Sequence, residues 1–209
     1  MTHSLRERRR QMLREEILEA THQLLTERGY AAMSMDELAA RVGVSKPTLY
    51  NQFPTKEDLI AAMATQLIER MLALVAGERS ASPLERLLRF LHTSVRLQVE
   101  HRTSTMQLWL PEIVDLLERH PHSRACLKRI DETIVATFHE AIQAGEIDPG
   151  ADVPSLVRVY YALSLTPSVG RLSIVDEPDA ERLADTVVDL FRRGLPRPAS
   201  PVAAQNTSD

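Results

Sequence analysis

The chain has 209 residues, of which 44% are hydrophobic and 26% charged, as in an ordinary soluble globular protein. The net charge of −4 argues against a general nucleic-acid binder, so any DNA affinity must come from locally placed cations. The single cysteine, Cys126, excludes an intrachain disulfide and favours a reducing compartment. We expect no secretory signal, because the charged N-terminus MTHSLRERRR has no apolar segment behind it, and no membrane span, since no stretch reaches about 18 uncharged apolar residues. The expected location is cytoplasmic.

The N-terminal segment is basic. Residues 1–10 hold four arginines against one glutamate. We predict that residues 1–9 are a flexible basic arm, with Arg9 and Arg10 reaching DNA phosphates or the minor groove. The alternative is a solvated, charged extension of the first helix. That helix is predicted over about 10–28 by apolar residues at helical spacing, which are Leu13, Ile17, Ala20, Leu24 and Leu25.

Residues 34–53 predict two short helices joined by a tight turn. Ser34 is an N-cap, and Glu37 three residues later completes a capping box. Gly43 ends the first helix, because glycine enters the left-handed conformation without steric cost. Ser45 caps the second helix, and Pro47 sits in its first turn, where a missing N–H is harmless. This is a helix-turn-helix, whose second helix can enter the DNA major groove.

The second helix of this motif has two faces. Leu49 and Phe53 are four residues apart and are expected to face the core, so Lys46, Tyr50 and Asn51 tend toward the other side. Lysine can bind phosphate or a guanine edge, and asparagine can pair with adenine. We therefore expect this side to contact DNA.

Residues 13–60 resemble the DNA-binding domain of TetR-family transcriptional regulators. The matching residues are Gly29-Tyr30, Leu38-Ala39, Gly43-Val44-Ser45, Thr48-Leu49-Tyr50, Phe53 and Lys56-Glu57-Asp58-Leu59. Asn51 and Gln52 depart from the family pattern, in which Tyr or His often precedes the Phe. With the contacts that the resemblance implies, the predicted DNA-binding residues are Arg9, Arg10, Ser34, Ser45, Lys46, Thr48, Tyr50, Asn51 and Lys56.

Further helices are predicted downstream from their apolar stripes. They cover about 56–75, 83–102, 106–119, 122–145, 153–165 and 179–193, with loops at 76–82 and 166–178. The first of them is long enough to connect the DNA-binding domain to a second domain. The expected fold is all-α, with a helix-turn-helix domain over 10–55, a helical effector-binding and dimerisation domain over 56–194, and a disordered tail over 195–209.

The resemblance implies two tasks for the second domain. In TetR-like regulators the last two long helices form a four-helix bundle with a second subunit, which here would be 153–165 and 179–193. Such a homodimer would read a palindromic operator in double-stranded DNA. The central helices would enclose a site for an unknown small-molecule effector. Its candidate polar residues are His92, Arg96, Gln107, Trp109, Glu112, His139 and Tyr160, each of which could instead be a surface or satisfied core residue.

Motifs of catalysis are missing from the sequence. It contains no H-E-x-x-H, no glycine-rich phosphate loop and no G-x-S-x-G, so we expect neither an enzyme nor a cofactor. His101, His120 and His122 precede Cys126 at spacings that fit no standard zinc pattern, so we expect no metal site. The sequence predicts a transcriptional regulator, most often a repressor, released from its operator by an effector. The alternative is a helix-turn-helix protein without a small-molecule site, controlled by a protein partner or acting architecturally.

Overall fold

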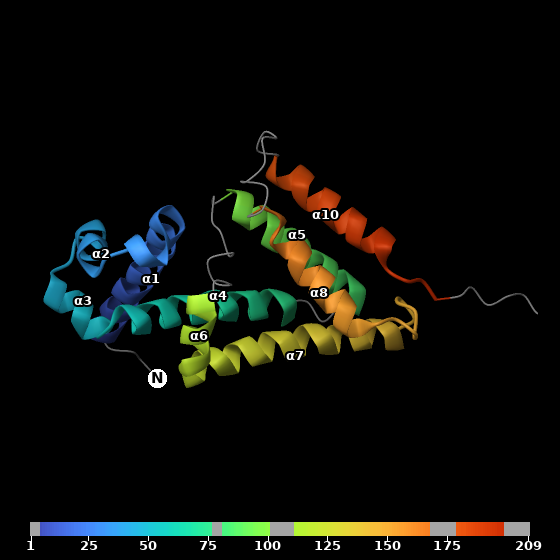
Figure 1. Ribbon diagram of the computed structural model, residues 1–209, viewed down its shortest axis with the longest axis horizontal. Coiled ribbons are helices and arrows are strands. Elements are labelled where there is room, and N and C mark those ends of the chain that lie inside the picture. Colours follow the sequence, from blue (N-terminus) through green and yellow to red (C-terminus); the bar gives the residue numbers. More distant parts are fainter. Residues whose placement is uncertain (1–4, 77–80, 101–110, 168–178, 199–209) are drawn as a thin grey trace, which may run out of the picture.

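The computed structural model describes residues 5–76, 81–100, 111–167 and 179–198. Within these ranges every regular element is an α-helix, which confirms the predicted fold class. The helices are α1 (Leu5–Ala32), α2 (Met35–Val42), α3 (Lys46–Gln52), α4 (Lys56–Ala76), α5 (Pro83–Glu100), α6 (Pro111–Arg119), α7 (Pro121–Gln143), α8 (Val153–Ser164) and α10 (Ala180–Gly194). Helices α1–α3 gather at one end, and α4 and α7 run side by side from there toward α5, α8 and α10 (Figure 1).

Helix α1 is longer than its apolar stripe predicts. It begins at Leu5 rather than near residue 10, so residues 5–9 form the charged helical extension that was the alternative to a flexible arm. Residues 5–12 are all exposed, so no burial pattern marks this start. The segment contains neither Gly nor Pro, and Leu, Arg, Glu and Gln extend an existing helix at little cost. Near the predicted end, the backbone kinks at Gly29, which has φ 75° and ψ 167°.

Local capping interactions form the helix-turn-helix as predicted. The Ser34 hydroxyl accepts a hydrogen bond from the Glu37 amide at 3.1 Å and starts α2. Gly43 ends this helix in the left-handed conformation, with φ 75° and ψ 29°, and the next amide, of Val44, donates to the Ala39 carbonyl at 3.0 Å. The Ser45 hydroxyl accepts from the Thr48 amide at 3.3 Å and starts α3. These bonds satisfy helix-end groups that would otherwise lack partners.

The head, which we define as α1–α3 with the first half of α4, has its own hydrophobic core. Helix α6 contributes to this core although it lies far along the chain. The fully or nearly fully buried side chains at its centre are Ile17, Leu24, Leu25, Leu38, Leu49, Phe53, Leu59, Ile60, Met63, Ile113, Leu116 and Leu117. Burial of side chains of this size stabilises the head by about 1.5–3 kcal/mol each before chain entropy is subtracted.

The body, which we define as α5, α7, α8, α10 and the second half of α4, has a second core built around Tyr160. The Tyr160 ring meets Phe138 and Phe191 edge-on, at centroid distances of 5.8 and 5.4 Å. Its hydroxyl donates to the Leu87 carbonyl at 2.7 Å, so the polar end of the buried ring is satisfied. None of the helices that the structure describes is long and apolar enough to cross a membrane.

Helix α4 belongs to both cores. Its first half places Leu59 and Met63 in the head, and its second half places Ile68 and Leu72 in the body. A buried hydrogen bond of 2.9 Å between the hydroxyls of Thr65 and Ser123 ties the middle of α4 to α7. The domain boundary predicted at residues 55/56 stays a prediction, since the two cores meet along α4.

Parts of several predicted segments lie outside the described residues. These are residues 1–4 of the predicted arm, 101–102 of the helix predicted at 83–102, 106–110 of the helix predicted at 106–119, 77–80 of the first loop, 168–178 of the second, and 199–209 of the tail. The first residues of the predicted tail are folded against the body. Leu195 is buried, and the Pro196 carbonyl accepts a hydrogen bond from the Asp148 amide at 3.0 Å. A residue-by-residue composition argument does not detect such a distant contact.

His22 is a buried histidine on α1. Its Nε2 has no hydrogen-bond partner among the described residues. Burial lowers the pKa of His22, and the Arg70 charge acts in the same direction while Glu19 opposes it. The folded head therefore favours the neutral form of the His22 imidazole.

The protein should lose stability in mild acid because of His22. Below the unfolded-state pKa of about 6.5 the unfolded chain takes up a proton that the folded head resists, so unfolding becomes easier as pH falls. The slope from this one group is at most about 1.4 kcal/mol per pH unit. Urea unfolding at several pH values between 7.5 and 5 should show a weaker pH dependence for His22→Leu. The exposed His139→Leu variant is the control and should behave like the wild type. An unchanged slope in His22→Leu would contradict this assignment.

Candidate nucleic-acid interface

Helix α3 lies at the tip of the head (Figure 1). Leu49 is fully buried in the head core, whereas Lys46, Tyr50 and Asn51 are exposed on the same helix. The separation of faces expected from spacing is therefore present. A short helix with one anchored face and one polar, exposed face has the form required to enter a major groove.

The predicted hydroxyl contacts also hold the motif together. Ser34 and Ser45 are the N-caps of α2 and α3, and the Ser45 and Thr48 hydroxyls are 2.7 Å apart. Each hydroxyl has one donor and two acceptor sites, so capping leaves it able to bond to a phosphate. Their contact with DNA stays a prediction.

Lys46 is engaged in a surface ion pair. Its Nζ donates to Asp36 Oδ2 at 2.6 Å, and both side chains are well exposed. An exposed pair of this kind contributes about 0–1 kcal/mol, so Lys46 can exchange its partner for a phosphate at little cost. Asp36 would then be left as an unpaired negative charge beside α3.

Lys56 has a structural partner rather than a free ammonium group. Its Nζ donates to the carbonyls of Tyr30 and Met33, at 2.5 and 2.7 Å, and lies 4.4 Å from the Tyr30 ring centroid. Burial lowers the pKa of Lys56. An ammonium has three donors, of which two are used here. Lys56 therefore fixes the start of α4 to the α1–α2 connection. One of its three donors remains for the predicted contact with DNA.

Arg14 contacts the end of α3, a role that the sequence does not predict. Its guanidinium carbon lies 4.3 Å from the Phe53 ring centroid, and its Nη1 donates to the Gln52 carbonyl at 3.5 Å. A cation therefore covers the last turn of α3, where helix-end carbonyls favour positive charge. Arg14 and Gln52 are 38 residues apart, so no local sequence pattern predicts this contact. The predicted Arg9 and Arg10 lie exposed on the same helix, nearer its start.

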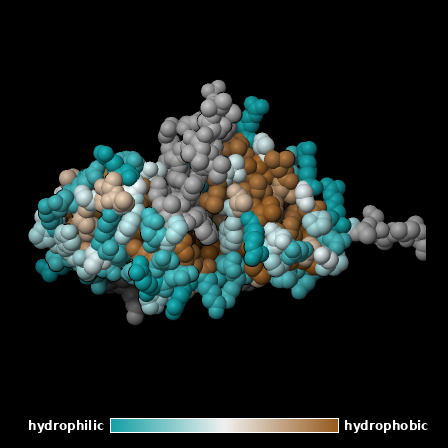
Figure 2. Space-filling view, in the orientation of Figure 1, coloured by the Kyte–Doolittle hydropathy of each residue, from teal (hydrophilic) through white to brown (hydrophobic). Residues whose placement is uncertain are grey.

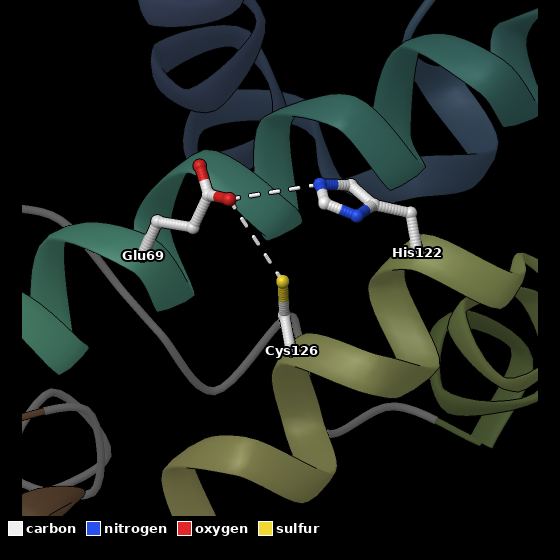
Figure 3. A group of neighbouring side chains, drawn as sticks. All are labelled: Glu69, His122 and Cys126. Atoms are coloured by element: carbon white, nitrogen blue, oxygen red, sulfur yellow. Dashed lines mark hydrogen bonds and ion pairs between the residues drawn. The ribbon is translucent and has the colours of Figure 1, made fainter.

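Three potential metal ligands meet between α4 and α7. Glu69 Oε1 lies 3.6 Å from His122 Nε2 and 3.9 Å from Cys126 Sγ (Figure 3). Burial raises the pKa of the Cys126 thiol, with a further contribution from Glu69 and an opposing one from Arg129. His120, at the N-cap of α7, turns instead toward Asp58 at 3.5 Å. In the sequence we consider His122 and Cys126 together but not Glu69, which is more than fifty residues from both.

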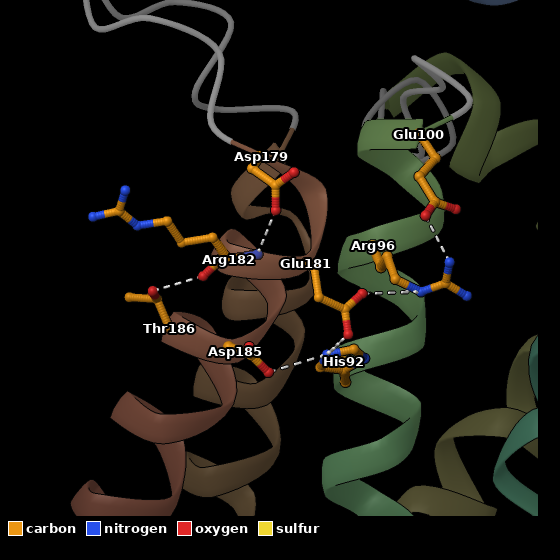
Figure 4. A network of polar contacts seen from close by, with 8 residues as sticks. All are labelled: His92, Arg96, Glu100, Asp179, Glu181, Arg182, Asp185 and Thr186. Carbon is orange, nitrogen blue, oxygen red and sulfur yellow. Dashed lines mark hydrogen bonds and ion pairs between the residues drawn. The ribbon is translucent and has the colours of Figure 1, made fainter.

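Two predicted effector-binding residues connect α5 to α10. His92 Nε2 lies 3.5 Å from Glu181 and 3.3 Å from Asp185. Arg96 pairs with Glu100 at 2.6 Å and with Glu181 at 3.8 Å (Figure 4). Both side chains are half-buried; His92 contacts two acids of α10, whereas the shorter contact of Arg96, to Glu100, stays within α5 (Figure 4).

Three other predicted effector residues, Tyr160, Glu112 and His139, lie apart from this pair. Tyr160 is at the centre of the body core, with its hydroxyl bonded to Leu87. Glu112 is exposed on α6 and His139 is exposed on α7. Gln107 and Trp109 lie outside the described residues. The predicted set therefore stays a prediction.

Comparisons with known proteins agree with this geometry. The family model described as bacterial regulatory proteins, tetR family, matches residues 17–63. The HTH-type transcriptional regulator UidR of Escherichia coli K12 is 30% identical over 191 residues, which cover 88% of this chain and 90% of UidR. The alignment covers most of the chain, so the similarity is not confined to the head.

Two solved structures share the fold. The ketosteroid transcriptional regulator KstR2 of Mycobacterium tuberculosis superposes with a TM-score of 0.69 at 20% identity, covering 88% of this chain and 95% of that one. The transcriptional regulator FadR of Bacillus subtilis, in complex with stearoyl-CoA, gives 0.63 at 23% identity, covering 87% and 98%. At these identities the likeness establishes the fold.

Opposite charge changes at the Lys46–Asp36 pair should have opposite effects on DNA affinity. Lys46→Gln should weaken binding about two- to fivefold on duplexes of any sequence and reduce the slope of log affinity against log salt by about one. Asp36→Asn should strengthen binding by a similar factor, since it frees Lys46 and removes a negative charge. Fluorescence anisotropy with a labelled duplex, over a series of salt concentrations, measures both effects.

The exposed pair Lys128–Glu132 on α7, at 3.5 Å, offers matched control variants. Lys128→Gln and Glu132→Gln make the same charge changes on the body. If they shift the affinity as much as the head variants do, the effect comes from net charge and not from α3.

Proposed function

The chain belongs to the TetR family of bacterial regulatory proteins and is a DNA-binding transcriptional regulator, and we propose that it is a homodimeric repressor released from a palindromic operator by a small-molecule effector. The observation that carries this proposal is the capped helix-turn-helix, in which Leu49 anchors α3 while Lys46, Tyr50 and Asn51 remain exposed. These side chains are the ones suited to phosphates and base edges.

Helices α8 and α10 support dimerisation through the body. Val159 on α8 and Leu190 on α10 are large apolar side chains that are 50% and 61% exposed. Figure 2 shows apolar surface gathered at the end of the molecule where α5, α8 and α10 lie. Contiguous apolar surface of this kind marks protein–protein contacts. A two-fold dimer would present two α3 helices to two half-sites, so the dimer would bind an operator more tightly than one small head could.

Helix α4 is the element that would pass the effector signal to the head. It is packed in both cores, so a body conformation that tilts α4 also changes the position of α3 in each subunit. The effector needs to prefer one conformation by about 1–3 kcal/mol, which corresponds to about 5–150-fold in operator affinity. Because the related FadR structure holds stearoyl-CoA, acyl-CoA esters are the first effector class to test.

Selection of bound sites from random duplex DNA tests the operator proposal. We expect an enriched palindrome whose half-sites are about 10 base pairs apart, or a multiple of that, with a steep loss of affinity as salt rises. Failure to enrich any sequence would contradict sequence-specific binding.

The selected duplex then becomes the probe for effector release. Acyl-CoA esters of increasing chain length are added to the complex, with free coenzyme A as the control. Release by an ester and not by coenzyme A supports the effector class. Retention of the complex with every ester would refute that class while leaving the operator in place.

Charge placed on the apolar surface should separate the subunits. Val159→Asp and Leu190→Asp should shift the protein from dimer to monomer in analytical ultracentrifugation and weaken operator binding at least about tenfold, since both half-sites no longer bind together. Both residues are exposed in the single chain, so folding should be retained. Ala136→Asp adds the same charge at an exposed position of α7 and should stay dimeric. A dimeric Leu190→Asp and Val159→Asp double variant would refute this interface.

A further inference from the structure

We propose that Glu69, His122 and Cys126 form a binding site for one divalent transition-metal ion, with Zn²⁺ as the best match. The site lies between α4 and α7 (Figure 3). Its existence does not depend on the proposed repressor mechanism. The three side chains offer one nitrogen, one oxygen and one sulfur ligand.

The distances are close to those of a tetrahedral site. Zinc bonds of about 2.0–2.3 Å place neighbouring ligand atoms about 3.3–3.6 Å apart. Here the carboxylate oxygen lies 3.6 Å from the imidazole nitrogen and 3.9 Å from the sulfur, and all three atoms fall within 4.8 Å of one another. Small side-chain rotations suffice to bring them onto a single ion.

The helices hold these ligands in register. His122 and Cys126 are four residues apart on α7, so they share one face of the helix. Glu69 comes from α4, and the buried Thr65–Ser123 hydrogen bond fixes the two helices one turn away. The packing of α4 against α7 therefore already brings the three ligand atoms together, without any backbone movement.

The ligand types and their exposure determine which ions fit. Thiolate and imidazole favour Zn²⁺ and similar borderline ions, whereas Mg²⁺ and Ca²⁺ require oxygen ligands. The side chains of Glu69 and His122 are 47% and 76% exposed, while Cys126 is 3% exposed at the floor. An ion can enter from solvent, displace the thiol proton into water, and keep a fourth position for water.

A second cluster, formed by His92, Glu181 and Asp185, is a weaker candidate. It has no sulfur ligand, and the Arg96 guanidinium already lies 3.8 Å from Glu181. A fixed positive charge at this distance repels an incoming cation. The observations therefore favour the α4–α7 cluster.

An ion at this site would clamp α4 to α7. Since α4 also carries the head, metal binding would restrict the positions open to α3; this consequence, unlike the site itself, rests on the proposed function. Operator affinity measured with and without Zn²⁺ reports on it separately from metal binding.

Titration of the metal-stripped full chain with Co²⁺ tests the site directly. We expect one equivalent to produce a thiolate-to-cobalt charge-transfer band together with the strong visible absorption of four-coordinate Co²⁺. Cys126 is the only cysteine of the chain, so the band can come from no other residue. Zn²⁺ should bleach it at one equivalent. Absence of the charge-transfer band would overturn the proposal.

Ligand variants give a second, independent test. His122→Gln and Glu69→Gln change exposed residues, so folding should be retained, and each should weaken Zn²⁺ binding at least about 100-fold in competition with a chelating indicator. Cys126→Ser should remove the charge-transfer band. His139→Gln, an exposed histidine elsewhere on α7, is the control and should bind like the wild type. Unchanged affinity in His122→Gln and Glu69→Gln would show an adventitious ion only.

Discussion

Helix α4 takes part in two hydrophobic cores, and this shared membership constrains the whole molecule. Leu59 and Met63 are buried in the head, and Ile68 and Leu72 are buried in the body, with only about one helical turn between the two sets. A helix does not bend sharply without Pro, Gly or a bulge, and α4 contains no Pro or Gly. The head and body therefore cannot change their relative orientation without repacking at least one core.

Contacts at the start of α4 extend this constraint to the DNA-binding motif. Lys56 holds the carbonyls of Tyr30 and Met33, and Arg14 covers the last turn of α3. Each contact crosses from one helix to another at a point where backbone groups would otherwise lack partners. These contacts tie the DNA-binding motif to the first half of α4.

Local interactions account for what the sequence could predict. The caps at Ser34 and Ser45 and the turn at Gly43 depend on residues within five positions of one another, and the structure contains all three. The start of α1 at Leu5 could not be predicted in this way, because an exposed helical extension has no apolar periodicity.

Long-range packing explains what sequence reasoning could not reach. His92 and Arg96 are predicted to line an effector site in the second domain, yet they contact acids of α10. The family resemblance predicts that Lys56 contacts DNA, and the carbonyls to which it donates lie more than twenty residues away. Glu69 is more than fifty residues from His122 and Cys126. In each case the partner is set by how helices pack, which no local spacing records.

Gly29, near the end of α1, and Gly43, at the end of α2, differ in how readily another residue can replace them. Neither has a heavy atom within 4 Å of where a Cβ would stand, so backbone conformation and not crowding decides. Gly43 occupies the left-handed region that asparagine and aspartate also visit, so descendants of this sequence can exchange it at modest cost. Gly29, with φ 75° and ψ 167°, occupies a region that is essentially closed to residues with a side chain. Gly29 can therefore be replaced only if the backbone between α1 and α2 adopts another conformation.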